Sequence, residues 1–228
     1  MLPVGVPLPG WTTRPMPPRT PMEGLYCRVE PLSAERHAQM LFAAYGGAAE
    51  NWTYLGQEPP SDFSVYRAWV ETVAEGNDPL FHAIIEKEGG QAVGVAALMR
   101  IDAANGVIEI GSINFAPVLK RSRAGTEAIF LFACRVFDEL GYRRFEWKCD
   151  SLNAASRRAA RRYGFTFEGI FRQAVVYKGR NRDTAWFSII DREWPQLREG
   201  YQRWLDPGNF DAEGRQRTSL GAWIGTAG

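Results

Sequence analysis

Three apolar runs with strand character follow one another in the middle of the chain, separated only by tight turns. They cover residues 80–87, 91–101 and 107–115. The first two meet across Glu88-Gly89-Gly90, and the third follows Asn105-Gly106. An Asn-Gly pair adopts the positive φ angles of a two-residue hairpin turn, so it joins antiparallel neighbours. The sequence therefore predicts an antiparallel three-stranded meander, against which the other elements must pack.

The remaining periodic segments alternate between helix and strand. Before the meander we expect a strand over 25–32, a helix capped by Ser33 and a second helix starting at Ser61 or Asp62. After it we expect a helix over 122–140, a strand over 143–150, a short helix over 153–163 and strands over 165–178 and 183–191. A meander followed by β-α-β crossovers predicts an α/β (α+β) fold. Its central sheet is mixed and mostly antiparallel, with about seven strands and helices on both faces.

The two ends of the chain differ from this body. Residues 1–24 hold seven of the fourteen prolines, which favours an extended arm. Residues 1–22 of this arm are expected to be dispensable for folding. Residues 25–195 form the predicted domain. Residues 196–228 are predicted as a C-terminal helix and a Gly-rich tail, in which Trp223 can dock back onto the body.

Composition limits the classes of function. The net charge of +1 gives no overall field that attracts nucleic acid, and no apolar run approaches the ~20 residues that span a bilayer. The first residues lack the basic start and apolar centre of a signal peptide. The three cysteines show no metal-ligand spacing, and only two histidines are present. We expect a cytoplasmic protein without a metal site, membrane contact or nucleic-acid partner.

A basic segment at a strand-to-helix junction is the first candidate for chemistry. Residues 119–128 read LKRSRAGTEA. A helix start offers unpaired N–H groups and the positive end of the helix dipole, and Lys120, Arg121 and Arg123 add positive charge. The segment predicts an anion site, with a solvated basic loop as the alternative.

These motifs, in this order, resemble the GNAT superfamily of acetyltransferases over roughly residues 24–195. The basic segment is similar to the pyrophosphate loop Q/R-x-x-G-x-G/A followed by T-E-A. Downstream, the segments 153–158 and 163–165 resemble N-x-x-S-R and L-G-F. Glu168-Gly169, Arg172, Gly179 and Asp183 resemble the E-G-x-x-R…G…D pattern of the RimJ/RimL-like branch, which includes ribosomal-protein N-terminal acetyltransferases.

The resemblance implies acetyl-CoA as co-substrate and assigns residues to it. Those residues are Phe115, Lys120, Arg121, Ser122, Arg123, Ala124, Gly125, Thr126, Asn153 and Ser156. Arg123 departs from the family pattern, because it stands where the first loop glycine is expected. A glycine would let the backbone approach the pyrophosphate closely, whereas Arg123 is expected to bind phosphate with its side chain. The arginines of the helix over 153–163 are either a 3′-phosphate site or a solvated helix face.

The resemblance also assigns catalytic roles. Glu109 is the candidate general base, with a sheet-edge salt bridge or a solvent-facing glutamate as the alternatives. Ser156 is the candidate acid for the leaving thiolate. Its alternative is an ordinary position in the first turn of a helix capped by Asn153. Tyr163 is a second candidate acid, although core packing is the commoner role, and Cys149 is interpreted as a buried structural thiol.

The acceptor pocket is assigned to the first helices and to the last two strands. Trp52 and Tyr54 are expected to form one wall, and Arg172, Tyr177 and Asp183 another. The predicted function is transfer of acetyl to a primary amine of a protein N-terminus or a small molecule, by direct attack. The alternative is a non-catalytic module that binds acyl-CoA. A homodimer is left open.

Overall fold

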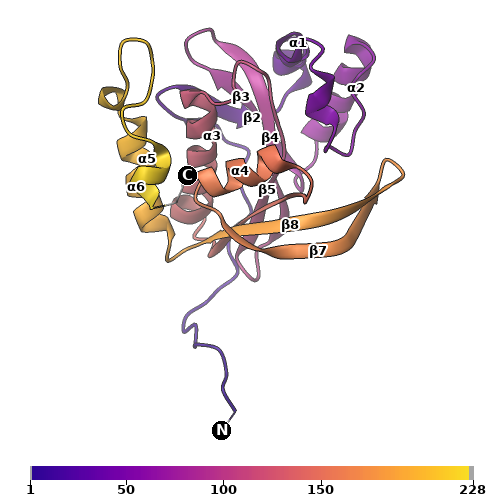
Figure 1. Cartoon of the computed structure of the whole chain (residues 1–228). Helices are drawn as coiled ribbons and strands as arrows, with labels where there is room; N and C mark the ends of the chain where they lie inside the picture. Colours follow the sequence, from indigo (N-terminus) through magenta and orange to yellow (C-terminus); the bar gives the residue numbers. More distant parts are fainter. Residues whose placement is uncertain (1, 226–228) are drawn as a thin grey trace.

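The computed structural model describes residues 2–225 and is built around one eight-stranded sheet. The strand order is β1-β2-β3-β4-β5-β6-β8-β7, and every pairing is antiparallel except the parallel pair β5–β6 (Figure 1). The strands are β1 Met22–Glu23, β2 Cys27–Pro31, β3 Leu80–Glu86, β4 Gln91–Asp102, β5 Val107–Phe115, β6 Arg144–Asp150, β7 Thr166–Tyr177 and β8 Arg180–Ile190. The predicted meander and the mixed, mostly antiparallel sheet are confirmed.

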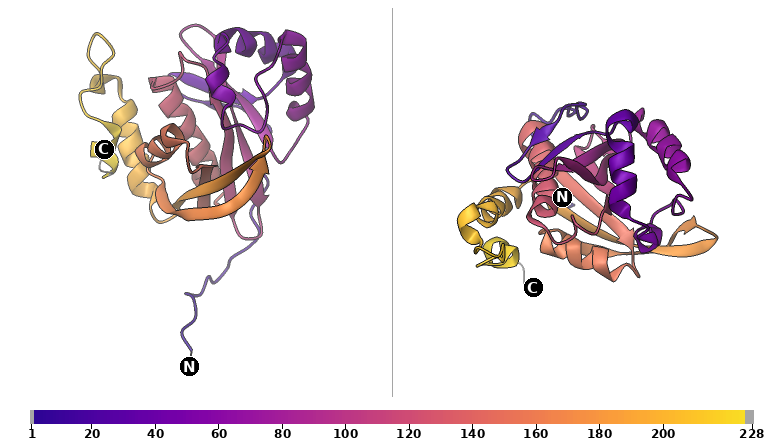
Figure 2. Two further views of the ribbon diagram at one scale, coloured as in Figure 1. Left: turned by 45° about the vertical axis from the view of Figure 1, so that its right-hand side comes forward. Right: turned by 90° about the horizontal axis from the view of Figure 1, so that it is seen from above.

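Helices cover both faces of this sheet (Figures 1 and 2). Helices α1 and α2 pack on one side, and α3 and α5 pack on the other, with α4 beside the last strands. Their bounds are α1 Ala34–Tyr45, α2 Phe63–Ala74, α3 Arg123–Cys134, α4 Ala154–Arg162, α5 Trp194–Leu205 and α6 Leu220–Ile224. Short helical turns cover Ala49–Trp52 (η1), Arg135–Glu139 (η2) and Pro207–Asn209 (η3). None of the helices within residues 2–225 has the length and apolarity that crossing a membrane requires.

Side-chain caps set the beginnings of the helices where the sequence predicts them. Ser33 accepts a hydrogen bond from the Arg36 N–H, and Asp62 accepts one from the Val65 N–H. Each cap satisfies an N–H group that has no partner inside the helix. The helix predicted over 122–140 remains α-helical to Cys134 and then widens into the π-helical turn η2.

The Pro-rich arm is docked on the body from Trp11 onward, which the sequence did not predict. The Trp11 indole N–H donates to the Ala104 carbonyl at 2.8 Å. Arg19 donates to the carbonyls that end α2, those of residues 74–76. The buried guanidinium of Arg135 donates to the Thr20 and Pro21 carbonyls. Proline lacks a donor but keeps its carbonyl, so a Pro-rich segment still supplies acceptors.

The C-terminal part is also packed rather than loose. A side chain on Gly200 of α5 would come within 2.4 Å of Ile224 of α6, so the two helices lie in direct contact. The last three residues of the predicted Gly-rich tail, 226–228, lie outside the described residues.

Candidate functional site

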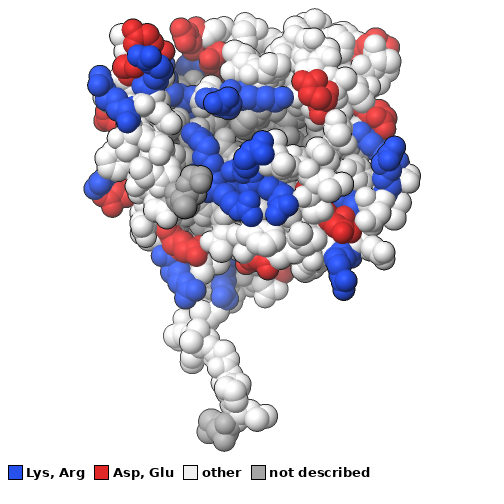
Figure 3. Space-filling view, viewed as in Figure 1, with Lys and Arg blue, Asp and Glu red and all other residues white. Residues whose placement is uncertain are grey.

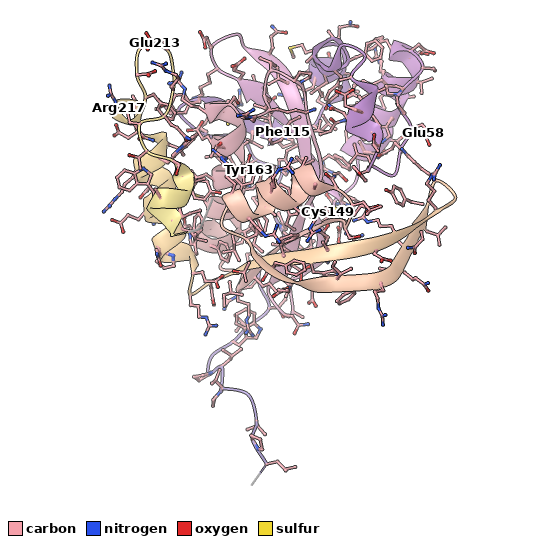
Figure 4. All side chains as sticks on the ribbon, viewed as in Figure 1. Glu58, Phe115, Cys149, Tyr163, Glu213 and Arg217 are labelled. Carbon is pink, nitrogen blue, oxygen red and sulfur yellow. The ribbon has the colours of Figure 1, made fainter. Side chains whose placement is uncertain are left out.

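The parallel strands β5 and β6 separate partway along their length. They pair only from Val107 with Arg144 to Ile110 with Trp147. Further along, β5 stays paired with β4 and β6 stays paired with β8. A cleft of about 2150 Å³ opens beside the divergence, and Phe115 of β5, Cys149 of β6 and Tyr163 at the end of α4 line it (Figure 4).

A bulge in β5 lies beside this opening. Asn114 pairs with Val95 and Gly111 with Ala97, so β5 carries one more residue than β4 over this stretch. Ser112 has a φ angle of 49°, in the left-handed region that non-glycine residues rarely occupy. Strained backbone of this kind is found preferentially at functional sites. The bulge interrupts the β4–β5 ladder beside the cleft, and the pairing resumes at Asn114 and Phe115.

The N-terminus of α3 faces the same cleft. Lys120, Arg121, Ser122, Arg123 and Ala124 line it. The Ser122 hydroxyl accepts from the Gly125 N–H at 2.9 Å, which uses one of the free donors of the first turn. The N–H groups of Arg123 and Ala124 precede the first intrahelical hydrogen bond and remain available to an anion.

Two residues of the predicted loop lie beneath this surface. Gly125 and Thr126 are buried, and a side chain on Gly125 would come within 2.5 Å of the Leu119 carbonyl. The glycine is required for close packing of the turn. Thr126 accepts a hydrogen bond from Arg162 of α4 at 3.1 Å, which joins the two helices on either side of the cleft.

The start of α4 lies across the opening from β5. Asn153 caps the helix by accepting from the Ser156 N–H at 3.0 Å, and the Ser156 hydroxyl accepts from the Trp147 indole N–H at 2.9 Å. Both residues line the cleft. Cys149 lies beside Ser156, and burial raises the pKa of its thiol. The thiol is therefore protonated at neutral pH and unsuited to nucleophilic attack.

Basic side chains gather on this face of the molecule over α4 and around the cleft (Figure 3). Arg158, Arg161 and Arg162 of α4 line the cleft together with the cations at the start of α3. A concentration of positive charge beside a helix N-terminus suits a ligand with several phosphates.

Glu109 lies on β5 with only 2% of its surface exposed. Its carboxylate accepts from the Arg100 guanidinium at 2.8 and 2.9 Å, and the Lys148 ammonium lies 3.0 Å away. Lys148 also pairs with Glu146 at 2.7 Å and lies over the Trp186 ring. Glu109 is thus one member of a line of alternating charges across the sheet. Glu109 also lines the cleft, and β5 lies inside the sheet rather than at its edge, so the predicted role as base stays a prediction beside this ion-pair role.

A second carboxylate, Asp150, lines the cleft at the end of β6 with 4% exposure. Its oxygens accept from neutral donors: the Leu152 N–H at 2.8 Å and the Tyr177 hydroxyl at 2.9 Å. Burial, together with the bond to Asp150, raises the pKa of Tyr177 to about 12, so this phenol is a stable donor at neutral pH. Sequence analysis did not find this pair, because the two residues meet only when the β7–β8 hairpin folds back over β6.

The residues predicted for the acceptor pocket are only partly brought together. Tyr54 lines the cleft, and its hydroxyl donates to the Leu152 carbonyl at 3.3 Å. Trp52 is buried instead, with its ring 5.1 Å from that of Tyr45. Arg172 is exposed on β7 and does not line the cleft. Asp183 also lies off the cleft, where a bond from the Gln173 N–H lowers the pKa of its carboxyl.

The tip of the β7–β8 hairpin contacts the turn η1. Lys178, at the tip of the β7–β8 hairpin, donates to the Trp52 carbonyl at 2.7 Å. The Trp52 carbonyl makes this contact, and its side chain belongs to the core. Tyr54 and Asp150 both line the cleft, and both bond the backbone of Leu152.

Comparison with known proteins agrees with this geometry. The family described as Acetyltransferase (GNAT) domain matches residues 28–166. A crystal structure of a GCN5-related N-acetyltransferase from Brucella melitensis is 52% identical, covers 96% of this chain and 100% of its own, and superposes with a TM-score of 0.94.

Two curated relatives are more distant in sequence. The uncharacterized N-acetyltransferase p20 of Bacillus licheniformis is 29% identical over 76% of this chain and 99% of its own length. The ribosomal N-acetyltransferase-like protein YdaF of Bacillus subtilis (strain 168) is 27% identical over 73% of this chain and 90% of its own.

Proposed function

The chain belongs to the GNAT family of acetyltransferases, which use acetyl-CoA, and from this premise we propose that it moves acetyl to a primary amine by direct attack. The observation that carries the proposal is the separation of β5 from β6 beside the free N-terminus of α3. An extended amide chain can follow the open strand edge while its phosphates lie against the helix start. Acetyl-CoA has this combination of groups.

The donor end of the proposed site uses the residues that line the cleft around α3 and α4. The amides at the start of α3, with Lys120 and Arg121, would hold the pyrophosphate. Phe115 and Asn153 lie on the two sides of the opening, where the pantetheine would run. Backbone N–H groups near Ile113 to Phe115 would stabilise the oxyanion that forms as the amine attacks.

Direct attack requires a neutral amine and no protein nucleophile. The protonated, buried thiol of Cys149 supports this, because an acetyl-cysteine intermediate would need a thiolate. The amine nitrogen bonds to the thioester carbon, the carbon–sulfur bond breaks, and the amine loses a proton. Ser156 lies beside Cys149 at the opening and is proposed to donate a proton to the departing sulfur.

The carboxylate that receives the amine is proposed to be Asp150. Its hydrogen-bond donors are neutral, so a buried negative charge faces the cleft and favours an incoming ammonium. Glu109 is already paired with two cations, Arg100 and Lys148, and we assign it the task of fixing Lys148 in the floor of the cleft. The prediction of Glu109 as the base stays a prediction until its rate effect is measured.

A protein N-terminus is the first acceptor to test. The support is the likeness to YdaF, whose name refers to ribosomal N-acetylation. The test measures thiol release from acetyl-CoA with a peptide that has a free N-terminus, the same peptide with a blocked N-terminus and an internal lysine, a polyamine and an aminoglycoside. Mass spectrometry then locates the acetyl group. Transfer to the free N-terminus alone supports the proposal, transfer only to small amines changes the acceptor class, and no transfer to any amine contradicts it.

A further inference from the structure

The cleft extends beyond the part of the chain that the family match covers. The match ends at residue 166, whereas one end of the cleft is lined by α5 and by the residues after it. Those residues include Trp204, Phe210, Arg215 and Leu220. We call residues 206–219 the C-terminal segment. Figure 4 labels Glu213 and Arg217 in this segment, on the side of the molecule away from the β7–β8 hairpin.

The C-terminal segment is held in a defined shape by its own polar contacts. The Asn209 amide donates to the Trp204 and Thr218 carbonyls at 3.1 Å each and accepts from the Thr218 N–H at 3.0 Å. The Trp204 indole N–H donates to the Gln216 side chain at 2.8 Å. Asn209 is itself buried. These contacts make the segment a fixed wall of the cleft.

This wall contacts the phosphate end of the cleft through Arg123. The Arg123 guanidinium carbon lies 4.9 Å from the centre of the Phe210 ring and 4.8 Å from that of Tyr26. Both distances are within the range of cation–π attraction. The side chain of the first residue of α3 is therefore held between two aromatic rings from distant parts of the sequence.

Tyr26 is fixed as firmly as Phe210. Its N–H donates to Glu127 at 2.7 Å, and its hydroxyl donates to the Leu205 carbonyl at 2.9 Å. Glu127 is buried and also accepts from the Leu25 and Cys27 N–H groups. The rings on both sides of Arg123 are thus anchored to the body, and the guanidinium is ordered before any ligand arrives.

We propose that the C-terminal segment is part of the coenzyme site, with Phe210 as a positioning residue that holds Arg123 toward the phosphates of coenzyme A. This inference rests on the proposed function. Arg123 stands where the family pattern has a glycine. A glycine lets the backbone approach the phosphates closely, whereas here the Arg123 side chain would bind them. A guanidinium pairs with phosphate through two parallel hydrogen bonds. Without the Phe210 ring, only Tyr26 restrains the side chain, so more of its freedom must be lost on binding, which costs affinity.

The test is a calorimetric titration with coenzyme A and, separately, with pantetheine, which lacks the phosphates. In Phe210→Leu, affinity for coenzyme A should fall about tenfold, the effect of ordering one long side chain, while affinity for pantetheine stays unchanged. Phe210→Tyr keeps the ring and should bind like wild type. Phe171→Leu, an exposed phenylalanine on β7, is the matched control and should change neither affinity.

A double-mutant cycle with Arg123→Gln tests whether Phe210 changes coenzyme A affinity through Arg123. If Phe210 acts through Arg123, then Phe210→Leu has no further effect in the Arg123→Gln background. Equal losses for coenzyme A and pantetheine, additive effects in the cycle, or wild-type affinity in Phe210→Leu would each overturn the inference. A wild-type protein that does not bind coenzyme A would instead contradict the proposed function.

Discussion

Replacing Asp150 and Glu109, the two buried carboxylates that line the cleft, by their amides separates their roles. Asp150→Asn and Glu109→Gln keep the shape of the side chain and remove the negative charge. We expect Asp150→Asn to lower kcat/KM by roughly 10²–10⁴-fold, the usual contribution of general-base catalysis. Part of the loss should be recovered at high pH, where more of the amine is already neutral. Stability should change by about 1 kcal/mol or less, because both donors to Asp150 are neutral and an amide oxygen can still accept.

The expected effect of Glu109→Gln is on stability. Breaking a buried ion pair costs about 3–5 kcal/mol, but two features of the structure reduce this value. The Arg100 side chain is 56% exposed and can return to solvent, and Lys148 keeps its partner Glu146 at 2.7 Å. We therefore expect a loss of about 2 kcal/mol, which for a chain of this size lowers Tm by roughly 4–8 °C. The rate should fall only slightly.

The assays are a pH–rate profile and a thermal melt for each variant beside wild type. The reasoning is refuted if Asp150→Asn retains wild-type kcat/KM. It is also refuted if Glu109→Gln loses the rate and melts like wild type, since that result would place the base on Glu109, as the sequence resemblance implied.

Three further predictions follow from the same contacts. Arg121→Glu with Arg123→Glu should weaken acetyl-CoA binding strongly in a calorimetric titration while far-UV circular dichroism stays unchanged, and unchanged affinity would move the phosphate site elsewhere. In chemical denaturation, a chain starting at Met22 should lose about 3 kcal/mol of the free energy of unfolding, because Arg135 loses carbonyl partners. A chain starting at Trp11 is the control and should have the wild-type free energy of unfolding. Burial lowers the pKa of His82 from its ordinary value near 6.5 to about 4. The neutral imidazole therefore contributes fully to the free energy of unfolding above pH 6.5. This contribution is lost as the pH falls from 6.5 toward 4, by about 3 kcal/mol in total. His82→Asn should flatten this dependence, and an equally steep curve in that variant would exclude His82 as its source.

Local features of the fold could be predicted because their determinants are close in sequence. Ser33, Asp62, Ser122 and Asn153 each cap a helix by bonding an N–H three residues on. The Asn-Gly turn and the strand runs likewise act over a few residues. Such signals can be recognised without knowledge of the tertiary structure.

The burial of a residue was harder to predict from the sequence than the face of the sheet on which it lies. The alternation in β6 predicts a polar face, and this face does carry Glu146 and Asp150. Yet both are buried, at 5% and 4% exposure. A strand pattern indicates which side a residue takes, and only the packed structure shows whether that side meets water.

The candidate site depends on contacts between distant segments, which the pattern could not supply. The Tyr177–Asp150 bond spans 27 positions, and the bonds from Arg135 to the Pro-rich arm span more than a hundred. Of the residues expected at the acceptor pocket, Tyr54 lines the cleft, whereas Trp52, Arg172 and Asp183 do not. Trp52, Arg172 and Asp183 were placed by resemblance, whereas their position relative to the cleft is set by the curvature of the β7–β8 hairpin and the packing of α1 and α2.

The most direct test of the central claim is a crystal structure of the complex with acetyl-CoA. We predict pantetheine density between residues 113–115 of β5 and 148–150 of β6, the pyrophosphate at the N–H groups of Arg123 and Ala124, and the acetyl group directed toward Asp150. Density for acetyl-CoA outside the β5–β6 cleft, or an acetyl group directed away from both Asp150 and Glu109, would contradict the account.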